Sequence, residues 1–457
     1  MFCIQKCLYL RLVIYEEYNM KKQNIKVILS LVMLLLSISM GKAQDLNPSN
    51  LTKSPYTRYG VGKLGSVGNA STKAMGDLSV VAYSNSYTNL YNPASLVAID
   101  TLTCLVEAGL NGEWQFSTEN GQKQSDFNAG FNYLSLHFPL WRNFAGALSL
   151  TPYSMVGYYY GVEEQDILEN PLIKNDTLIY KNYYQGSGGL QRVMMSVGWK
   201  PIATKTQTLN VGVNFGFIFG TVNHAGLINI TTGQAESTAI SRSFEARGFE
   251  AGLGIQYFHK LSAEKSLMFG LTYYPETPLR IHSENVAYSG ADTLMVNSKF
   301  WMQCPTKLGF GVSYIIDRKL QIGAEFSFDN WAKVAGMDAN LQKTDGIYKN
   351  IYKFAAGVEY QPSVFNQNYF KTCRYRAGAN VKKSYIETYG SQNTEFTISA
   401  GVGFPIGVNS RRRSLINFAA EYTHVNPSKS GMLKEDYINL TFGFTFNEMM
   451  FFRNRLR

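Results

Sequence analysis

Apolar and polar residues alternate along most of this chain, from about residue 101 onward. The clearest case is residues 209–219, where every second residue is apolar and the intervening residues up to Gly216 are asparagine or glycine. A period of two is that of a β-strand, whose successive side chains point to opposite faces. The sequence therefore predicts strands with one apolar face and one small or polar face.

This pattern recurs often enough to predict an all-β fold, a transmembrane antiparallel β-barrel of about 14 strands. A soluble sandwich seldom extends such strands over so long a stretch without a helix or a domain break, whereas a large barrel with a polar lumen does. An even number of strands also returns the C-terminus to the side on which the first strand begins. The predicted strands are 102–116, 127–140, 143–160, 189–200, 208–224, 243–258, 267–282, 299–317, 319–332, 348–361, 372–387, 394–407, 414–426 and 436–447.

Connections of unequal length predict which end of the barrel faces outward. Those after even-numbered strands are mostly short, whereas those after odd-numbered strands include residues 161–188, 225–242 and 333–347. Barrels of the outer membrane have short periplasmic turns and longer outer loops. We therefore expect these three ranges to be outer loops.

The composition agrees with a barrel rather than a soluble protein or a helical membrane protein. Charged residues make up 17% of the 457 residues and aromatic residues 14%, whereas soluble chains usually have about 25% charged residues. Mean hydropathy is nevertheless only −0.15, as alternating lipid-facing and water-facing positions would give. Outside the N-terminal leader, no apolar run approaches the roughly 20 residues of a membrane-spanning helix.

The N-terminus resembles a secretory signal peptide. Basic residues after Met20 precede an apolar run at 27–38, and Gly41-Lys42-Ala43 places small residues at the positions that signal peptidase requires. We predict cleavage between Ala43 and Gln44. Residues 1–19 precede a good start at Met20 and are interpreted as an over-called start, so residues 1–43 are assigned to this start and the signal peptide.

Residues 44–100 lack long alternation and are rich in Gly, Asn, Ser and Tyr. Three stretches resemble the FadL/TodX family of outer-membrane transporters for long-chain fatty acids and other hydrophobic compounds: 54–62 (SPYTRYGVG), 73–77 (KAMGD) and 92–95 (NPAS). The resemblance implies an N-terminal plug, or hatch, at 44–100 in the lumen, a barrel at 101–447 and a short tail at 448–457. It places the protein in the Gram-negative outer membrane as a multi-pass barrel.

The resemblance further implies passive uptake of hydrophobic small molecules, with lateral release through an inward kink in the third strand. Pro152 is the candidate for this kink, because proline removes a ladder donor and is disfavoured in a strand unless the strand bulges or bends. An ordinary bulge is an equally good interpretation. Asn92, Pro93, Ala94 and Ser95 are the candidate plug or gating residues, and a simple turn into the first strand has equal weight.

Other functions are less well supported by the sequence. The stretch 60–65 matches GxGxxG, but no apolar strand precedes it and no helix is predicted after it, so we expect no dinucleotide site. There is no GxSxG or HExxH motif and the five histidines are dispersed, so we predict neither an enzyme nor a metal site. Scattered positive charge in an exported chain does not favour nucleic-acid binding.

The predicted partners are therefore outer-membrane lipids, a hydrophobic small-molecule ligand and, during biogenesis, the barrel-assembly machinery that reads the aromatic final strand. We expect a monomer without a cofactor. The main alternative is a secretion-accessory or scaffold barrel of the same fold that docks protein partners. A hydrophilic porin is a third possibility.

The signal-peptide prediction can be tested directly. Intact mass measurement and N-terminal sequencing of the protein extracted from outer membranes should show a chain that begins at Gln44. A chain that retains the apolar run at 27–38 would contradict the prediction.

Overall fold

The computed structural model describes residues 52–101, 103–119, 121–170, 173–230, 238–289, 292–317, 319–337, 343–344, 348–364, 366–388, 390–406, 414–427 and 433–449. The predicted signal peptide, its cleavage site at Ala43 and Gln44, and the end of the predicted tail at 450–457 lie outside the described residues.

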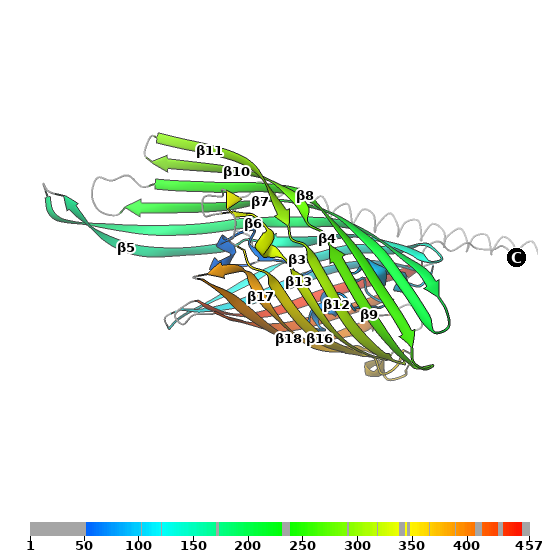
Figure 1. Cartoon of the computed structure of the whole chain (residues 1–457). Coiled ribbons are helices and arrows are strands. Elements are labelled where there is room, and N and C mark those ends of the chain that lie inside the picture. Colours follow the sequence, from blue (N-terminus) through cyan, green and yellow to red (C-terminus); the bar gives the residue numbers. More distant parts are fainter. Residues whose placement is uncertain are drawn as a thin grey trace, which may run out of the picture. The chain divides into compact units, whose positions relative to one another are not determined.

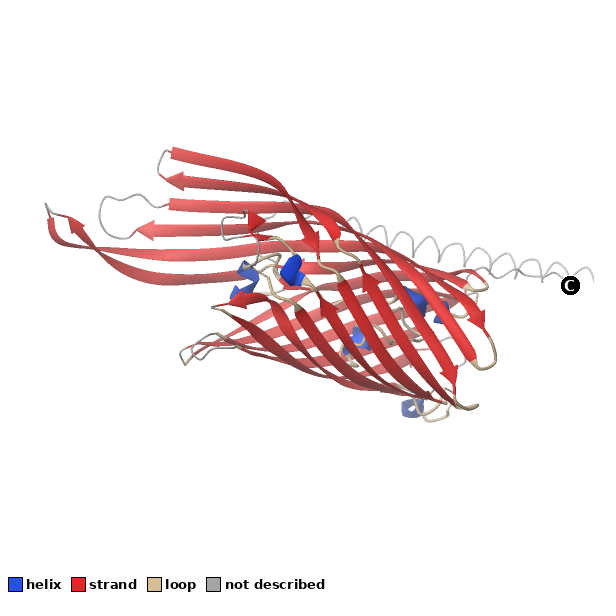
Figure 2. Cartoon of the chain, in the orientation of Figure 1, coloured by secondary structure: helices blue, strands red, loops and turns tan. Residues whose placement is uncertain are grey.

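The wall is a closed antiparallel barrel in which sequential strands pair and the last strand returns to pair with the first (Figures 1 and 2). Its segments are β2 (Thr103–Glu119), β3 (Gln122–Trp141), β4 (Phe144–Met155), β5 (Tyr158–Asn170), β6 (Ile173–Ala203), β7 (Gln207–Ile230), β8 (Thr238–Lys260), β9 (Lys265–Tyr274), β10 (Thr277–Ser289), β11 (Asp292–Cys304), β12 (Lys307–Ile316), β13 (Leu320–Asp329), β16 (Ile351–Tyr360), β17 (Arg374–Thr388), β18 (Ser391–Ile406), β19 (Ser414–Asn426) and β20 (Lys434–Met449). Three crossings of the wall are each interrupted and consist of two consecutive segments. These are β4 and β5, β9 and β10, and β11 and β12. The wall therefore has 14 crossings, which confirms the predicted fold class.

Shorter elements precede the wall or connect its strands. They are η1 (Pro55–Arg58), β1 (Lys63–Leu64), α2 (Ala70–Lys73), η2 (Pro93–Ala98), η3 (Trp331–Lys333), β14 (Gly336–Met337), β15 (Lys343–Thr344) and η4 (Tyr369–Thr372). None of the helices in the described part of the chain has the length and apolar character needed to cross a bilayer.

The alternation read from the sequence sorts side chains between the two faces of the wall. On β7, the Phe215 side chain is 51% exposed on the outer face, whereas Asn214 is buried towards the lumen. The ring of Phe215 contacts that of Phe249 on β8, with centroids 5.4 Å apart. Aromatic and aliphatic residues thus cover the outside of the wall, as contact with hydrocarbon requires.

Two of the predicted outer loops are wrong. Residues 161–188 and 225–242 belong largely to β5, β6, β7 and β8, which continue as strands well beyond the predicted ends. Alternation weakens in these stretches because both faces of a strand outside the membrane meet water, so polarity alone suggested loops. With β10 and β11 these strands form the projecting sheet, paired in the order β5, β6, β7, β8, β10, β11 and extending past β16 to β18 (Figure 1).

Residues 52–100, called the N-terminal segment below, lie against the lumenal face of the wall. Inward-facing glycines allow this close approach, because a Cβ atom added at any of them would lie 2.2–2.8 Å from an atom of the segment. These glycines occur on nine wall segments and are Gly198, Gly212, Gly254, Gly270, Gly309, Gly311, Gly357, Gly378, Gly401 and Gly443. The small residues that the sequence places on the polar strand face therefore accommodate the backbone of the N-terminal segment.

Two glycines of β7 provide a matched test of this packing. A methyl group at Gly212 would lie 2.5 Å from the carbonyl carbon of Pro93, whereas at Gly216, on the same face, the nearest atoms are 3.6 Å away. We expect Gly212→Ala to lower the free energy of unfolding by about 1–3 kcal/mol, through overpacking. Gly216→Ala should cause no loss. Urea unfolding in lipid vesicles, followed by tryptophan fluorescence, measures both, and equal midpoints would contradict the packing.

Candidate functional site

The candidate site is a cavity of about 330 Å³ inside the barrel, between the N-terminal segment and the wall. Thirteen of the 43 residues that line it are charged, and basic and acidic residues are present in nearly equal number. The basic ones are Lys63, Lys73, Arg192, Lys307, Lys353, Lys382 and Lys383, and the acidic ones are Asp77, Glu113, Asp329, Glu395, Glu421 and Glu435.

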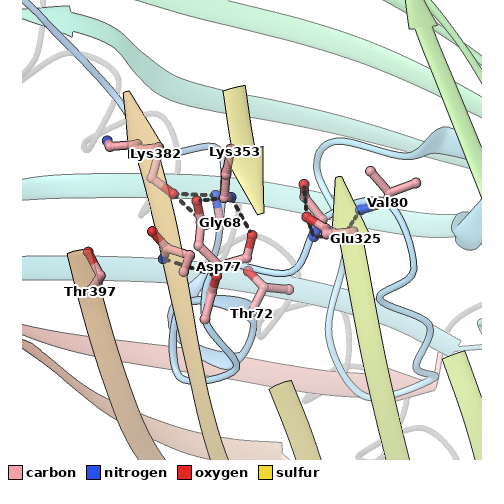
Figure 3. Close-up of polar contacts among 12 residues, drawn as sticks. Gly68, Thr72, Asp77, Val80, Glu325, Lys353, Lys382 and Thr397 are labelled. Atoms are coloured by element: carbon pink, nitrogen blue, oxygen red, sulfur yellow. Dashed lines mark hydrogen bonds and ion pairs between the residues drawn. The ribbon is translucent and has the colours of Figure 1, made fainter. Parts of the chain in front are cut away.

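One group of these charges surrounds Asp77, at a turn of the N-terminal segment (Figure 3). Its carboxylate accepts hydrogen bonds from the Lys353 ammonium at 2.8 Å and the Ser66 hydroxyl at 2.7 Å. Lys353 also donates to the Asp77 carbonyl oxygen at 2.8 Å. The turn is formed by Gly76 and Asp77 with φ of 73° and 58°, a left-handed conformation that Asp tolerates better than most residues. This geometry fixes the carboxylate towards β16.

Electrostatics favours the ionised form of Asp77. Burial by itself raises the pKa of this carboxyl group, but the Lys353 ammonium outweighs burial and holds the pKa below its ordinary value. The ionised carboxylate therefore stabilises the fold fully above its unfolded-state pKa of about 4, and this contribution is lost as the pH falls through the lowered pKa of the folded state.

Wall glutamates hold the N-terminal segment at other points. Glu325 on β13 accepts hydrogen bonds from the backbone N–H groups of Ser79 and Val80 at 2.7–3.0 Å (Figure 3). Glu435 on β20 accepts from the Ser54 hydroxyl at 2.7 Å, and Glu107 on β2 accepts from the backbone N–H of Thr88 at 2.5 Å. Carboxylates thus satisfy donors of a segment that has little secondary structure of its own.

A second group of charges lies on the wall itself. Glu250 on β8 pairs with Arg192 on β6 at 3.0 Å and with Lys307 on β12 at 2.8 Å. The side chains of Glu250 and Arg192 are only 2% and 3% exposed. Both cations also face the ring of Tyr153, within 5.8 Å of its centroid. Buried charges are tolerated here because each has a partner of opposite sign.

The predicted gating residues cap a short helix against the wall. Asn92 is the N-cap of η2, where its side-chain oxygen accepts from the backbone N–H of Ala94 at 3.1 Å, and Pro93 occupies the first turn. The Asn92 amide donates to the Val80 carbonyl at 2.8 Å, and the Ser95 hydroxyl donates to the Asn92 carbonyl at 2.7 Å. All four predicted residues are buried. These contacts show a structural role for them, and gating stays a prediction.

Pro152 lies where the third crossing departs from the regular wall. β3 pairs with β4 only as far as Leu134 and Leu150, and the register of β4 against β6 shifts between Pro152 and Ser154. The end of β4 then pairs with β1 of the N-terminal segment, and the chain is interrupted before β5 begins at Tyr158. Among the described strands, the outer part of β3 pairs only with β2.

An apolar cluster adjoins this break, here called the outer apolar cluster. It combines residues of the N-terminal segment, the broken crossing, the projecting sheet, the segment after β13, and β17 itself. Its buried members are Val61, Tyr153, Val156, Tyr158, Leu190, Ile218, Val222, Phe244, Ala246, Leu279, Ile281, Met302, Cys304, Trp331, Val334, Tyr348, Tyr385 and Ile386.

Sequence reasoning missed most of the charged site. Glu325 stood on the polar face of a predicted strand, but its partners Ser79 and Val80 are about 245 positions away in the chain. Lys353 likewise pairs with Asp77 across 276 positions. The only available signal was the face of the strand on which each charged residue lies. That face predicts that the residue points into the lumen, but it does not predict which residue it pairs with.

We expect Asp77→Asn to lower the free energy of unfolding by about 1–3 kcal/mol at pH 7, because the Lys353 ammonium loses its charged partner. The difference from the wild type should start to shrink below about pH 4, the unfolded-state pKa, and should disappear as the pH falls through the lowered pKa of folded Asp77. Asp126→Asn is the control, since its partner Lys53 is 43% exposed and such pairs contribute about 0–1 kcal/mol. Urea unfolding of reconstituted protein across this pH range provides the measurement. A pH-independent difference would contradict the assignment.

Comparisons with known proteins agree with this architecture. The solved structures that match include a FadL homologue of Pseudomonas aeruginosa (12% identity, 86% of this chain and 99% of that chain, TM-score 0.55). The toluene transporters TbuX of Ralstonia pickettii (14%, 84% and 98%) and TodX of Pseudomonas putida (16%, 85% and 99%) both match with a TM-score of 0.51. At these identities the likeness concerns the fold. No curated protein sequence matches.

A family model described as BamG matches residues 24–457, which is nearly the whole chain. The closed barrel, its apolar outer face and its structural neighbours make the protein a multi-pass β-barrel of the Gram-negative outer membrane. The chain belongs to the BamG family.

Proposed function

We propose that this barrel passes hydrophobic small molecules, such as long-chain fatty acids, passively across the outer membrane and releases them sideways at the break in the third crossing. The observation that carries the proposal is the separation of β4 from β3 beyond Leu150, next to the outer apolar cluster. A side opening at this break, next to apolar residues, would suit a ligand that is poorly soluble in water. The protein is expected to act as a monomer, without a cofactor.

The N-terminal segment has a defined part in this proposal, that of the plug. Its strand β1 pairs with Ser154 and Met155 at the end of β4, and the backbone N–H of Gly65 donates to the Tyr153 carbonyl at 2.9 Å. These bonds replace those that β3 would otherwise make with β4. The plug therefore holds the side opening while Asn92 to Ser95 anchor its other end.

Similarity in fold gives this proposal further support. The neighbouring structures are described as toluene transporters and as a FadL homologue, and they match over almost their whole length. A barrel of this shape is thus compatible with passage of hydrophobic compounds.

Two proline variants test the side opening. Pro152→Ala restores a ladder donor and favours pairing of β4 with β3, so uptake of a fluorescent hexadecanoic acid analogue by cells should fall at least about fivefold. Pro278→Ala, in the exposed face of β10, is the matched control and should leave uptake within about twofold. Heat-modifiable migration on gels verifies that both barrels fold. Equal uptake by cells that lack the protein would refute transport itself.

A second candidate function, a barrel that docks protein partners, is favoured by the character of the cavity. Several of its lining residues carry ion-paired charges, such as Asp77 with Lys353, and Lys307 with Glu250 of the neighbouring wall. A hydrophobic ligand in this cavity would have to displace water from charged side chains without replacing the hydrogen bonds of that water, which costs free energy. Mass spectrometry of gently purified protein separates the two candidates, because retained fatty acids favour transport and a stoichiometric polypeptide favours docking.

A further inference from the structure

We propose that the free edge of β11 in the projecting sheet binds an extended segment of a different polypeptide, which adds to the sheet as a strand. The proposal rests on the docking function above and names the surface and the kind of partner. It does not involve the cavity or the side opening.

Among the described residues, the backbone of β11 is paired on one side only. All thirteen residues from Asp292 to Cys304 have partners on β10, from Ser289 to Thr277, without a register shift. Within the described part of the chain, no other strand pairs with β11. Towards the exposed outer end of β11, from Asp292 to Asn297, the opposite edge therefore presents a regular row of N–H and C=O groups, which is the template that an incoming strand recognises.

The side chains of β11 favour a protein partner over water. Three consecutive residues near its outer end, Leu294, Met295 and Val296, are 66%, 56% and 45% exposed, and Trp301 is 59% exposed. Consecutive residues of a strand point to opposite faces. Apolar surface is therefore exposed on both faces of the same edge, where an added strand with apolar residues would cover it.

Natural edge strands usually carry features that prevent pairing, such as prolines, bulges or several charges. Between Thr293 and Cys304, β11 has Lys299 as its single charged residue and no proline, and its pairing with β10 has no bulge. The edge is also held rigidly, because β10 pairs in turn with β8 from Leu279 to Ser289. Binding a strand here would cost little ordering of the barrel itself.

Symmetry argues against a second copy of this chain as the partner. Two barrels in one membrane are related by an axis along the membrane normal. Such an axis keeps both β11 strands pointing the same way, so they would pair in parallel with Lys299 opposite Lys299. Like charges directly opposite are destabilising. A different chain can instead run antiparallel and place its own apolar residues over Leu294 and Val296.

Photo-cross-linking in living cells tests the proposal, with benzoylphenylalanine placed singly at Thr293, Met295 and Asn297. We expect cross-links to one polypeptide, and peptide sequencing should show that the linked position moves by two residues each time the probe moves by two. This stepwise register is specific to an added strand. Cross-links without it, cross-links to this chain itself, or no polypeptide cross-links would overturn the proposal.

Substitutions distinguish binding at the β11 edge from docking of a partner elsewhere on the protein. The double variant Leu294→Lys and Val296→Lys introduces charges of the kind that protect edge strands, so cross-linking at Asn297 should fall at least about tenfold. Tyr288→Lys is the control, because Tyr288 is 47% exposed at the same tip but lies on β10, which is paired on both sides. If a partner copurifies equally with the double variant, docking stands and the β11 site is refuted. If wild-type protein binds no partner, both are refuted.

Discussion

The close fit between the N-terminal segment and the inside of the wall is the constraint on which the rest of the structure depends. A segment with so little secondary structure leaves many backbone groups to be satisfied inside a barrel, where unpaired donors are costly. The wall supplies carboxylates such as Glu325 and Glu107 for these donors, and glycines where the two backbones approach each other. Charged residues in the lumen thus serve mainly to hold the segment. The cavity that remains between the segment and the wall is lined by some of the same residues.

The same segment determines the shape of the third crossing. β1 takes the place of β3 at the end of β4, so the break in the wall is stabilised by hydrogen bonds and is not merely a gap between strands. The register of β4 shifts next to Pro152, and a contribution of this proline to the break stays a prediction, based on its lack of a backbone donor. The transport proposed at this break and the docking proposed at the projecting sheet involve separate parts of the molecule.

The sequence was sufficient for the fold because a two-residue period survives wherever one face meets hydrocarbon and the other the lumen, as at Phe215 and Asn214. Where β6 and β7 extend beyond the membrane, both faces of each strand contact water and the two-residue alternation is lost. For this reason the sequence predicted loops where the structure has strands. The site was less predictable, since Asp77 and Lys353 meet only through closure of the barrel and share no local pattern. Asn92 and Pro93 were singled out as gating residues from a short local motif; the structure places them at the cap of η2, and gating stays a prediction.

The N-terminal segment contacts both the first and the last strand of the wall, which has a consequence for biogenesis. Ser54 binds Glu435 on the last strand to be synthesised, while Thr88 binds Glu107 on the first. The segment therefore contacts both of the strands whose pairing closes the barrel. Because one segment holds both strands, its contacts also favour their pairing, and the segment acts as an internal template for closing its own barrel.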